Sequence, residues 1–168
     1  MTSVCPKEGT SVLEHMAPAR INPKTTGDYL EQMTKSVFQT GISWQVVDKK
    51  WPQIREAFDG FDAAKVAGYG LAKLDALTED TRVVRNRKKL EAIFANARTM
   101  VALEREHGSF KAYLRSHPTF DDTLKDLRKR FKYLGDIGGY HFLYVVGEDV
   151  PEYETFCTSH HLTPMGGK

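Results

Sequence analysis

The sequence has no long apolar run, little cysteine and almost no net charge. No segment reaches the about 18 consecutive apolar residues that a membrane-spanning helix needs. Residues 1–10 lack the apolar core of a secretory signal peptide. The two cysteines, Cys5 and Cys157, lie near opposite ends of the chain and do not indicate a disulfide framework. We therefore expect a cytoplasmic protein with reduced thiols and no membrane partner.

What is present is typical of a globular domain. The 168 residues are enough to bury a core, and 40% of them are hydrophobic and 27% charged. The net charge is only +2, but residues 82–89 and residues 125–132 hold five basic residues each. Two such segments in a nearly neutral chain indicate contact with a polyanion, although solvated helix faces would give the same pattern.

Apolar residues recur with the period of a helix along most of the chain. In residues 28–40 they include Leu30, Met33 and Val37, which share one face. The longest such stretch is residues 85–108. The same pattern predicts shorter helices from residue 43 onward and at residues 61–70, 71–80, 109–117 and 121–131. No alternation typical of strands is found.

These patterns predict an all-α fold built from many short helices. Residues 1–25 contain three prolines and little periodicity, so we expect an irregular N-terminal arm there. Residues 26–168 contain no repeat, low-complexity segment or linker, and we expect a single helical domain. Nothing in the sequence indicates an oligomer, and the expected state is a monomer.

A glycine-rich segment, LGDIGGYHF at residues 134–142, follows a basic helix and precedes an apolar one. Glycine lets the backbone approach a ligand closely, and the first N–H groups of a helix bind anions. With basic side chains beside it, the natural anion is a nucleic-acid phosphate, although a generic glycine-rich helix turn is an alternative. The predicted DNA-binding residues are Arg130, Lys132, Gly135, Gly138, Gly139 and Tyr140.

This segment resembles the helix-hairpin-helix motif of DNA repair glycosylases, with Asp136 where glycine is commoner. Across residues 28–147 the chain also resembles the bacterial 3-methyladenine DNA glycosylase I family. The matching motifs are QTGISW at 39–44, VxxKK at 46–50, AFDGFDAAKVA at 57–67, RVVRNRxKL at 82–90, AIFANAR at 92–98, FxxY at 110–113 and KxLxKRFKYLG at 125–135. The resemblance implies a compact helix-hairpin-helix glycosylase fold.

The family removes alkylated adenine from DNA, so the resemblance implies a monofunctional glycosylase that acts on double-stranded DNA without a cofactor. Such an enzyme extrudes the damaged base into a pocket and breaks the bond to the sugar through a cationic transition state. By the resemblance, Trp44 is a wall of the base pocket, with a core aromatic as the alternative. Gln39, Ser43 and Ser36 belong to the same pocket.

The chain departs from the family at the base-reading glutamate, whose position is taken by Ser36. Glu31 cannot replace it, because at 100° per residue Glu31 lies about 160° around the helix from Met33, whereas Ser36 lies about 60° away. We therefore expect Glu31 to face solvent. The family's N-terminal aromatic residues are also missing, since no tryptophan precedes Trp44.

Asp149 is the predicted catalytic carboxylate, because the wider helix-hairpin-helix glycosylases place an aspartate downstream of the hairpin. Glu148 is the neighbouring candidate, and an ordinary acidic turn is the alternative. His141 is expected to begin the helix after the hairpin, either near a phosphate or as a structural residue. The leading hypothesis is a 3-methyladenine glycosylase. Its rivals are a non-catalytic helix-hairpin-helix DNA-binding relative with a degenerate base pocket and a helical interaction protein that binds no nucleic acid.

The resemblance also bears on metal binding, because the family holds a structural zinc between its two termini. The corresponding candidates are Cys5, His15, Cys157 and either His160 or His161, but their spacing differs from that of the family. Surface or packed residues are the simpler interpretation, and we expect no metal.

Overall fold

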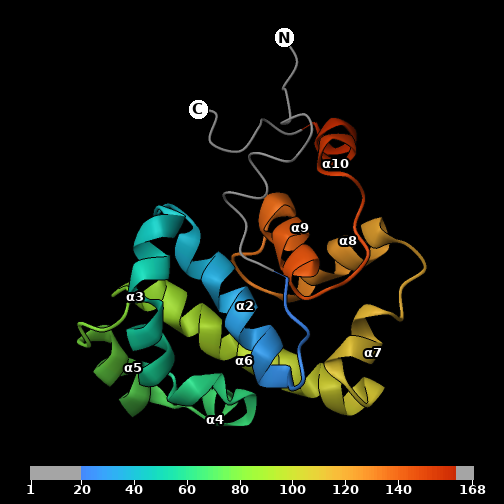
Figure 1. Ribbon diagram of the computed structural model, residues 1–168. Coiled ribbons are helices and arrows are strands. Elements are labelled where there is room, and N and C mark those ends of the chain that lie inside the picture. The colour runs from blue at the N-terminus through green and yellow to red at the C-terminus, as the bar shows by residue number, and fades with distance from the viewer. Residues whose placement is uncertain (1–19, 162–168) are drawn as a thin grey trace.

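The computed structural model describes residues 20–161, and within them the fold is entirely helical (Figure 1). The all-α prediction is therefore confirmed, and no strand occurs in the described part. The helices are α2 (Thr26–Gln39), α3 (Trp44–Ala57), the 3₁₀ turn η1 (Asp59–Phe61), α4 (Ala63–Ala67), α5 (Leu71–Thr78), α6 (Arg87–His107), α7 (Phe110–Leu114), α8 (Phe120–Arg130), α9 (Asp136–Val145) and α10 (Tyr153–His160). None of the described helices is long and apolar enough to cross a membrane.

Side-chain caps set where several of these helices begin. Thr25 caps α2 by accepting a hydrogen bond from the N–H of Asp28 (3.2 Å), and the Asp28 carboxylate accepts one from the N–H of Thr25 (3.2 Å). This reciprocal pair satisfies two N–H groups that have no intrahelical acceptor. Asp62 caps α4 in the predicted place, through the N–H of Lys65 (3.1 Å).

Helix α6 lies at the centre and packs against α2, α4, α5 and α7. The predicted stripe Leu30, Met33 and Val37 of α2 is fully buried. Beside it, Trp51 stacks on Phe61 with ring centroids 5.4 Å apart. Each such side chain contributes about 1.5–3 kcal/mol by leaving water, so this core holds the first half of the chain together.

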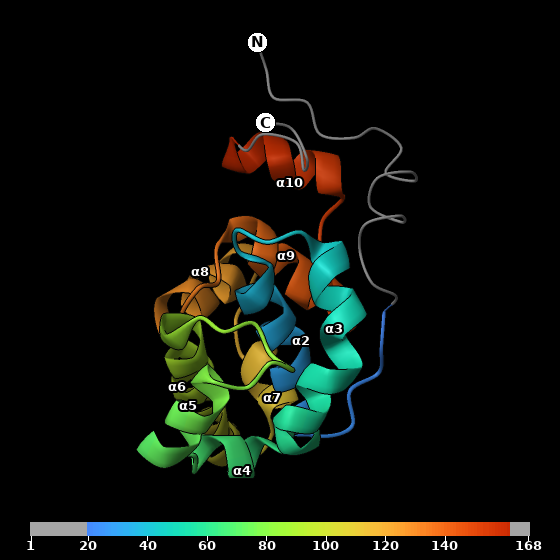
Figure 2. The same ribbon diagram turned by 90° about the vertical axis from the view of Figure 1, so that its left-hand side faces the viewer.

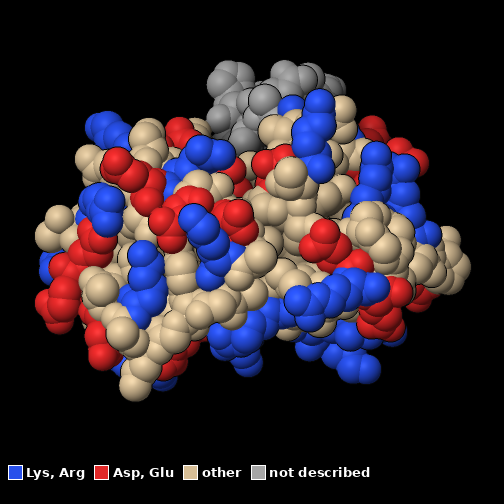
Figure 3. All heavy atoms as spheres, turned by 90° about the horizontal axis from the view of Figure 1, so that it is seen from below, with Lys and Arg blue, Asp and Glu red and all other residues tan. Residues whose placement is uncertain are grey.

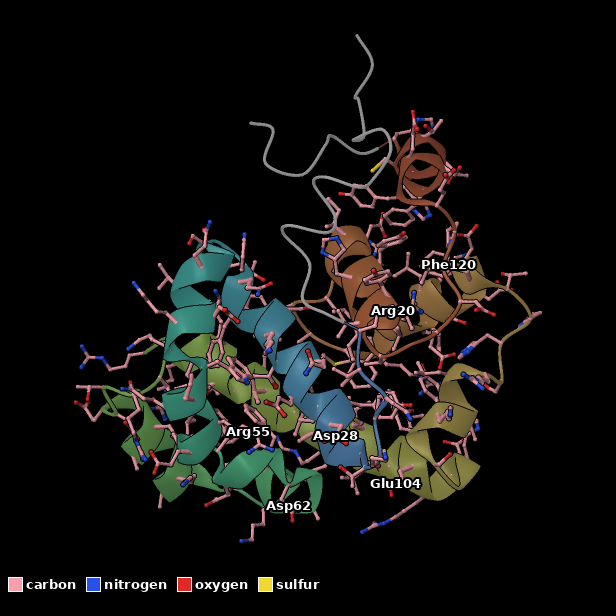
Figure 4. The ribbon with its side chains drawn as sticks, viewed as in Figure 1. Arg20, Asp28, Arg55, Asp62, Glu104 and Phe120 are labelled. Atoms are coloured by element: carbon pink, nitrogen blue, oxygen red, sulfur yellow. The ribbon has the colours of Figure 1, made fainter. Side chains whose placement is uncertain are left out.

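The α8–α9 hairpin packs on α2 through α9, and α10 lies above α9 in Figure 2. Helix α10, which the sequence patterns did not predict, joins a second apolar cluster that includes Leu124, Tyr140, Tyr153 and Phe156. Arg20 lies beside α9, with its guanidinium 4.5 Å from the centroid of the Tyr144 ring (Figure 4). These contacts fix α9 on several sides.

Candidate nucleic-acid interface

The QTGISW motif forms the junction between α2 and α3. Gly41 turns the chain with a φ of +80°, a conformation that favours glycine. Ser43 caps α3, because its hydroxyl accepts the backbone N–H three residues later (3.3 Å). Gln39 ends α2 and Trp44 begins α3, and both are half-buried. The motif is therefore first a helix junction, and it leaves part of Trp44 and Gln39 at the surface.

A buried lysine of α6 holds this junction in place. Lys89 is 5% exposed, and its ammonium donates to the carbonyl oxygens of Phe38 (3.4 Å) and Thr40. A cation here satisfies carbonyls at the end of α2 that lack intrahelical partners. Burial lowers the pKa of Lys89, because the charged form loses hydration. Lys89 thus points inward and does not belong to a basic contact surface.

Ser36 lies where α2 meets α9. A Cβ atom added at Gly138 would lie 3.8 Å from the Ser36 Cβ and 4.0 Å from its hydroxyl oxygen. Ser36 is half-buried. Figures 1 and 2 place the α2–α3 junction and α9 at the same end of the molecule. The structure therefore brings the predicted pocket residue Ser36 to the start of α9.

The hairpin turn lies before the glycine pair that was predicted to form it. Helix α8 ends at Arg130 and α9 begins at Asp136, so Gly138 and Gly139 are inside the first turn of α9. Tyr133, with a φ of +61°, occupies the left-handed position of the turn and is 41% exposed. The predicted position of the turn is wrong because glycine is the usual signal for a positive φ, whereas a tyrosine adopts this conformation here.

Gly139 serves helix packing. Its N–H donates to the carbonyl of Gly135 (2.8 Å), so the prediction that it offers this group to phosphate is wrong. A Cβ atom at this position would lie 2.3 Å from Cδ1 of Leu124 in α8. Gly135 precedes α9 as its N-cap, and Gly138 lies in the first turn, where helix N–H groups have no intrahelical acceptor. The predicted anion site is thus restricted to the residues before Gly139.

Tyr140 is a core residue. It is 1% exposed, and its hydroxyl donates to the carbonyl of Pro151 (2.7 Å). Burial raises the pKa of Tyr140 to about 12. Its prediction as a DNA contact is therefore wrong, because the side chain points towards α10 rather than solvent.

An asparagine that the sequence patterns did not single out fixes the turn. Asn96 of α6 is 1% exposed, and its side-chain oxygen accepts the N–H of Lys132 (2.8 Å) while its amide nitrogen donates to the carbonyl of Lys132 (3.2 Å). Both backbone groups of one turn residue are thereby satisfied from the central helix. The Lys132 side chain remains exposed.

Some of the basic residues in segments 82–89 and 125–132 have acidic partners. Arg130 pairs with Asp126 (2.9 Å), Arg128 with Asp136 (2.9 Å), and Arg87 with an aspartate of α5. On a different face, seen from below in Figure 3, Lys and Arg are also mixed with Asp and Glu. Exposed basic side chains without an ion pair in the described part include Arg85, Lys88, Lys129 and Lys132.

Asp149 lies away from the predicted pocket residues. It is exposed in the segment that follows the C-terminal end of α9 and lines a depression of about 400 Å³ with Arg115 and Phe120. Ser36 faces the opposite end of this ten-residue helix, which is about 15 Å long. Glu148 is paired with Arg115 (3.1 Å). The structure thus does not bring Asp149 together with Ser36.

Contrary to the prediction, Glu31 does not face solvent. Its side chain is 14% exposed, and its carboxylate accepts hydrogen bonds from Trp51 Nε1 (2.8 Å) and Arg55 Nε (3.2 Å). The prediction considered a single buried stripe on α2, whereas α3 packs along another face of the same helix. Glu31 remains far around α2 from Ser36, about 140° at 100° per residue.

His141 is the sixth residue of α9 and not its first, as had been expected. Its Nε2 atom is buried and has no hydrogen-bond partner among the residues that the structure describes. Burial lowers the pKa of His141 to about 4, so the ring is neutral at physiological pH.

The described residues contain no group of three or more His, Cys, Asp and Glu side chains arranged to hold a metal ion. Two of the zinc candidates, Cys5 and His15, lie outside the described residues. His160 lies within hydrogen-bonding distance of Asp136 (3.3 Å) and Asp121 (3.2 Å), and this contact links α10 to α8 and α9.

The chain is similar in sequence to known proteins. A family model described as methyladenine glycosylase matches residues 23–137. The DNA-3-methyladenine glycosylase of Haemophilus influenzae is 32% identical over 130 residues, covering 65% of this chain and 70% of that protein. DNA-3-methyladenine glycosylase 1 of Escherichia coli is 31% identical with the same coverage.

The fold is also similar to solved structures of glycosylases. 3-Methyladenine DNA glycosylase I from Staphylococcus aureus matches with a TM-score of 0.67 and 27% identity, over 84% of this chain and 87% of that one. A variant of 3-methyladenine DNA glycosylase I in complex with 3-methyladenine matches with a TM-score of 0.67 and 27% identity, over 84% and 88% of the two chains. The resemblance first seen in the sequence motifs is confirmed, and the chain belongs to the methyladenine glycosylase family.

Proposed function

We propose that this chain is a monofunctional DNA glycosylase that extrudes 3-methyladenine from double-stranded DNA and hydrolyses its bond to the sugar. The observation that carries the proposal is that Gly138, in the first turn of α9, faces Ser36 closely enough for an added Cβ atom to lie 3.8 Å from the Ser36 Cβ. The α2–α3 junction therefore lies close to the hairpin. A base held against Trp44 would then lie next to the hairpin that contacts the DNA backbone. The proposal includes a cytoplasmic location, because a DNA repair enzyme acts where the chromosome is. It also includes a monomeric state.

The mechanism follows from the chemistry of the lesion. Alkylation at N3 makes the base a cation and a good leaving group, so the protein must mainly extrude it, stack it and exclude competing bases. Trp44 supplies the stacking surface, Gln39 and Ser36 supply polar contacts, and Lys132 with the N–H groups before Gly139 binds phosphate. Asp149 is outside this site, and we do not assign it a role in base release.

Single-turnover release of 3-methyladenine from alkylated duplex DNA tests the proposal. Loss of base stacking in Trp44→Ala removes about 1–3 kcal/mol, so we expect release to slow by roughly 5- to 150-fold. Asp149→Asn, which changes an exposed carboxylate away from the pocket, is the matched control and should release base like wild type. Salt-sensitive DNA binding with no release of any alkylated base would instead favour a non-catalytic relative with a degenerate pocket.

A further inference from the structure

Two buried polar atoms without partners lie on aromatic rings that touch each other. Within residues 20–161, His141 Nε2 and the Tyr153 hydroxyl have no hydrogen-bond partner. The two rings are nearly parallel, at 29°, with centroids 5.9 Å apart, and the Tyr140 ring lies 5.8 Å from His141 on another side. Buried polar groups are nearly always satisfied in native proteins, so a pair of unsatisfied atoms indicates a missing partner.

The position of His141 on α9 relates it to the proposed base pocket. It follows Gly138 by three residues, so it lies one turn along the helix and about 60° around it. Gly138 is the residue that faces Ser36. The polar pocket residues Ser36 and Gln39 carry no ionisable group. His141 therefore lies one helical turn beyond the residue that faces Ser36, and the extruded base would have to extend along α9 to reach its ring nitrogen.

We propose that His141 reads the edge of the extruded base through Nε2, with the Tyr153 hydroxyl as a second polar contact. This inference rests on the proposed glycosylase function and deepens it. With its proton on Nδ1, the neutral ring presents a lone pair at Nε2, which can accept a hydrogen bond from the exocyclic amino group of adenine. A neutral group also does not repel the positive charge of a base alkylated at N3, and the low pKa of His141 keeps the ring neutral.

The test replaces His141 by phenylalanine and by glutamine. His141→Phe keeps an aromatic ring but removes the nitrogen, so we expect release of 3-methyladenine to fall about 10- to 100-fold at saturating enzyme. Because an unsatisfied buried atom is removed as well, the melting temperature should stay the same or rise, an outcome that a purely structural histidine would not give. His141→Gln retains a hydrogen-bonding group and should restore part of the rate. Tyr144→Phe, one turn further along α9, is the matched control.

A second measurement separates failure of this inference from failure of the proposed function. The ¹⁵N resonances of the His141 ring are followed while free 3-methyladenine is added to wild-type protein, with unmethylated adenine as the comparison. Active wild type with equally active His141→Phe would overturn the role of His141 and leave the glycosylase function standing. If wild type releases no base, the proposed function is refuted. In that case, a shift of the Nε2 resonance on adding 3-methyladenine would support binding of the base by His141, and an unchanged resonance would overturn the role of His141.

Discussion

Lys89 offers the sharpest test of how the α2–α3 junction is held. Lys89→Met keeps most of the aliphatic side chain but removes the ammonium that bonds the carbonyls of Phe38 and Thr40. A hydrogen bond from a charged donor is worth about 1.5–3 kcal/mol, and a cation at a helix C-terminus adds about 0.3–1 kcal/mol. The cost of burying the charge, which lowers the pKa of Lys89, offsets part of this. We therefore expect a net loss of about 1–3 kcal/mol of unfolding free energy.

The assays are urea unfolding, thermal unfolding and single-turnover base release. A domain of this size loses about 2–4 °C of melting temperature per kcal/mol, so the expected decrease is about 2–12 °C. Base release should fall as well, since Gln39 and Trp44 flank the carbonyls that Lys89 holds. Lys88→Met is the matched control, because Lys88 is exposed on the same helix. A Lys89→Met protein with wild-type stability and activity would refute the idea that this lysine organises the junction.

The further predictions concern α9 and the hairpin turn. Because the pKa of His141 is lowered from 6.5 to about 4, the unfolded chain binds a proton before the folded protein does as the pH falls. The unfolding free energy should therefore decrease by about 3 kcal/mol between pH 6.5 and pH 4. The His141→Phe variant should lack this decrease when its unfolding free energy is measured with denaturant. Gly139→Ala should cost about 1–3 kcal/mol through its clash with α8, whereas calorimetry should find Gly138→Ala neutral or stabilising, because its Cβ has room. Lys132→Ala should reduce the slope of log DNA affinity against log salt concentration by about 0.9. Asn96→Ala should weaken DNA binding and lower the unfolding free energy by about 1–3 kcal/mol, because both hydrogen bonds to the backbone of the turn are lost.

The sequence patterns predicted the helices with a continuous apolar stripe and missed features that depend on tertiary contacts. The stripe of Leu30, Met33 and Val37 is buried as expected, because its period alone defines the face. Asn96 could not be recognised, since a polar residue inside a helix does not reveal that it faces a turn 36 residues away. The hairpin was misplaced because Tyr133 adopts the conformation for which glycine is the usual signal.

By the resemblance, Ser36 stands where the family has a glutamate, and this difference would have a physical consequence for the proposed pocket. A carboxylate near the start of α9 would be favoured by the helix dipole and would attract a cationic base, whereas Ser36 supplies a neutral hydroxyl. Glu31 cannot compensate, because its carboxylate is engaged by Trp51 and Arg55 on the α3 side of α2. In the proposed pocket, discrimination between bases would then come from shape, stacking and hydrogen bonds rather than from charge. In its proposed role, the neutral ring of His141 on α9 would meet this requirement. The missing carboxylate at position 36 and the unpartnered Nε2 of His141 among the described residues would then have a common explanation.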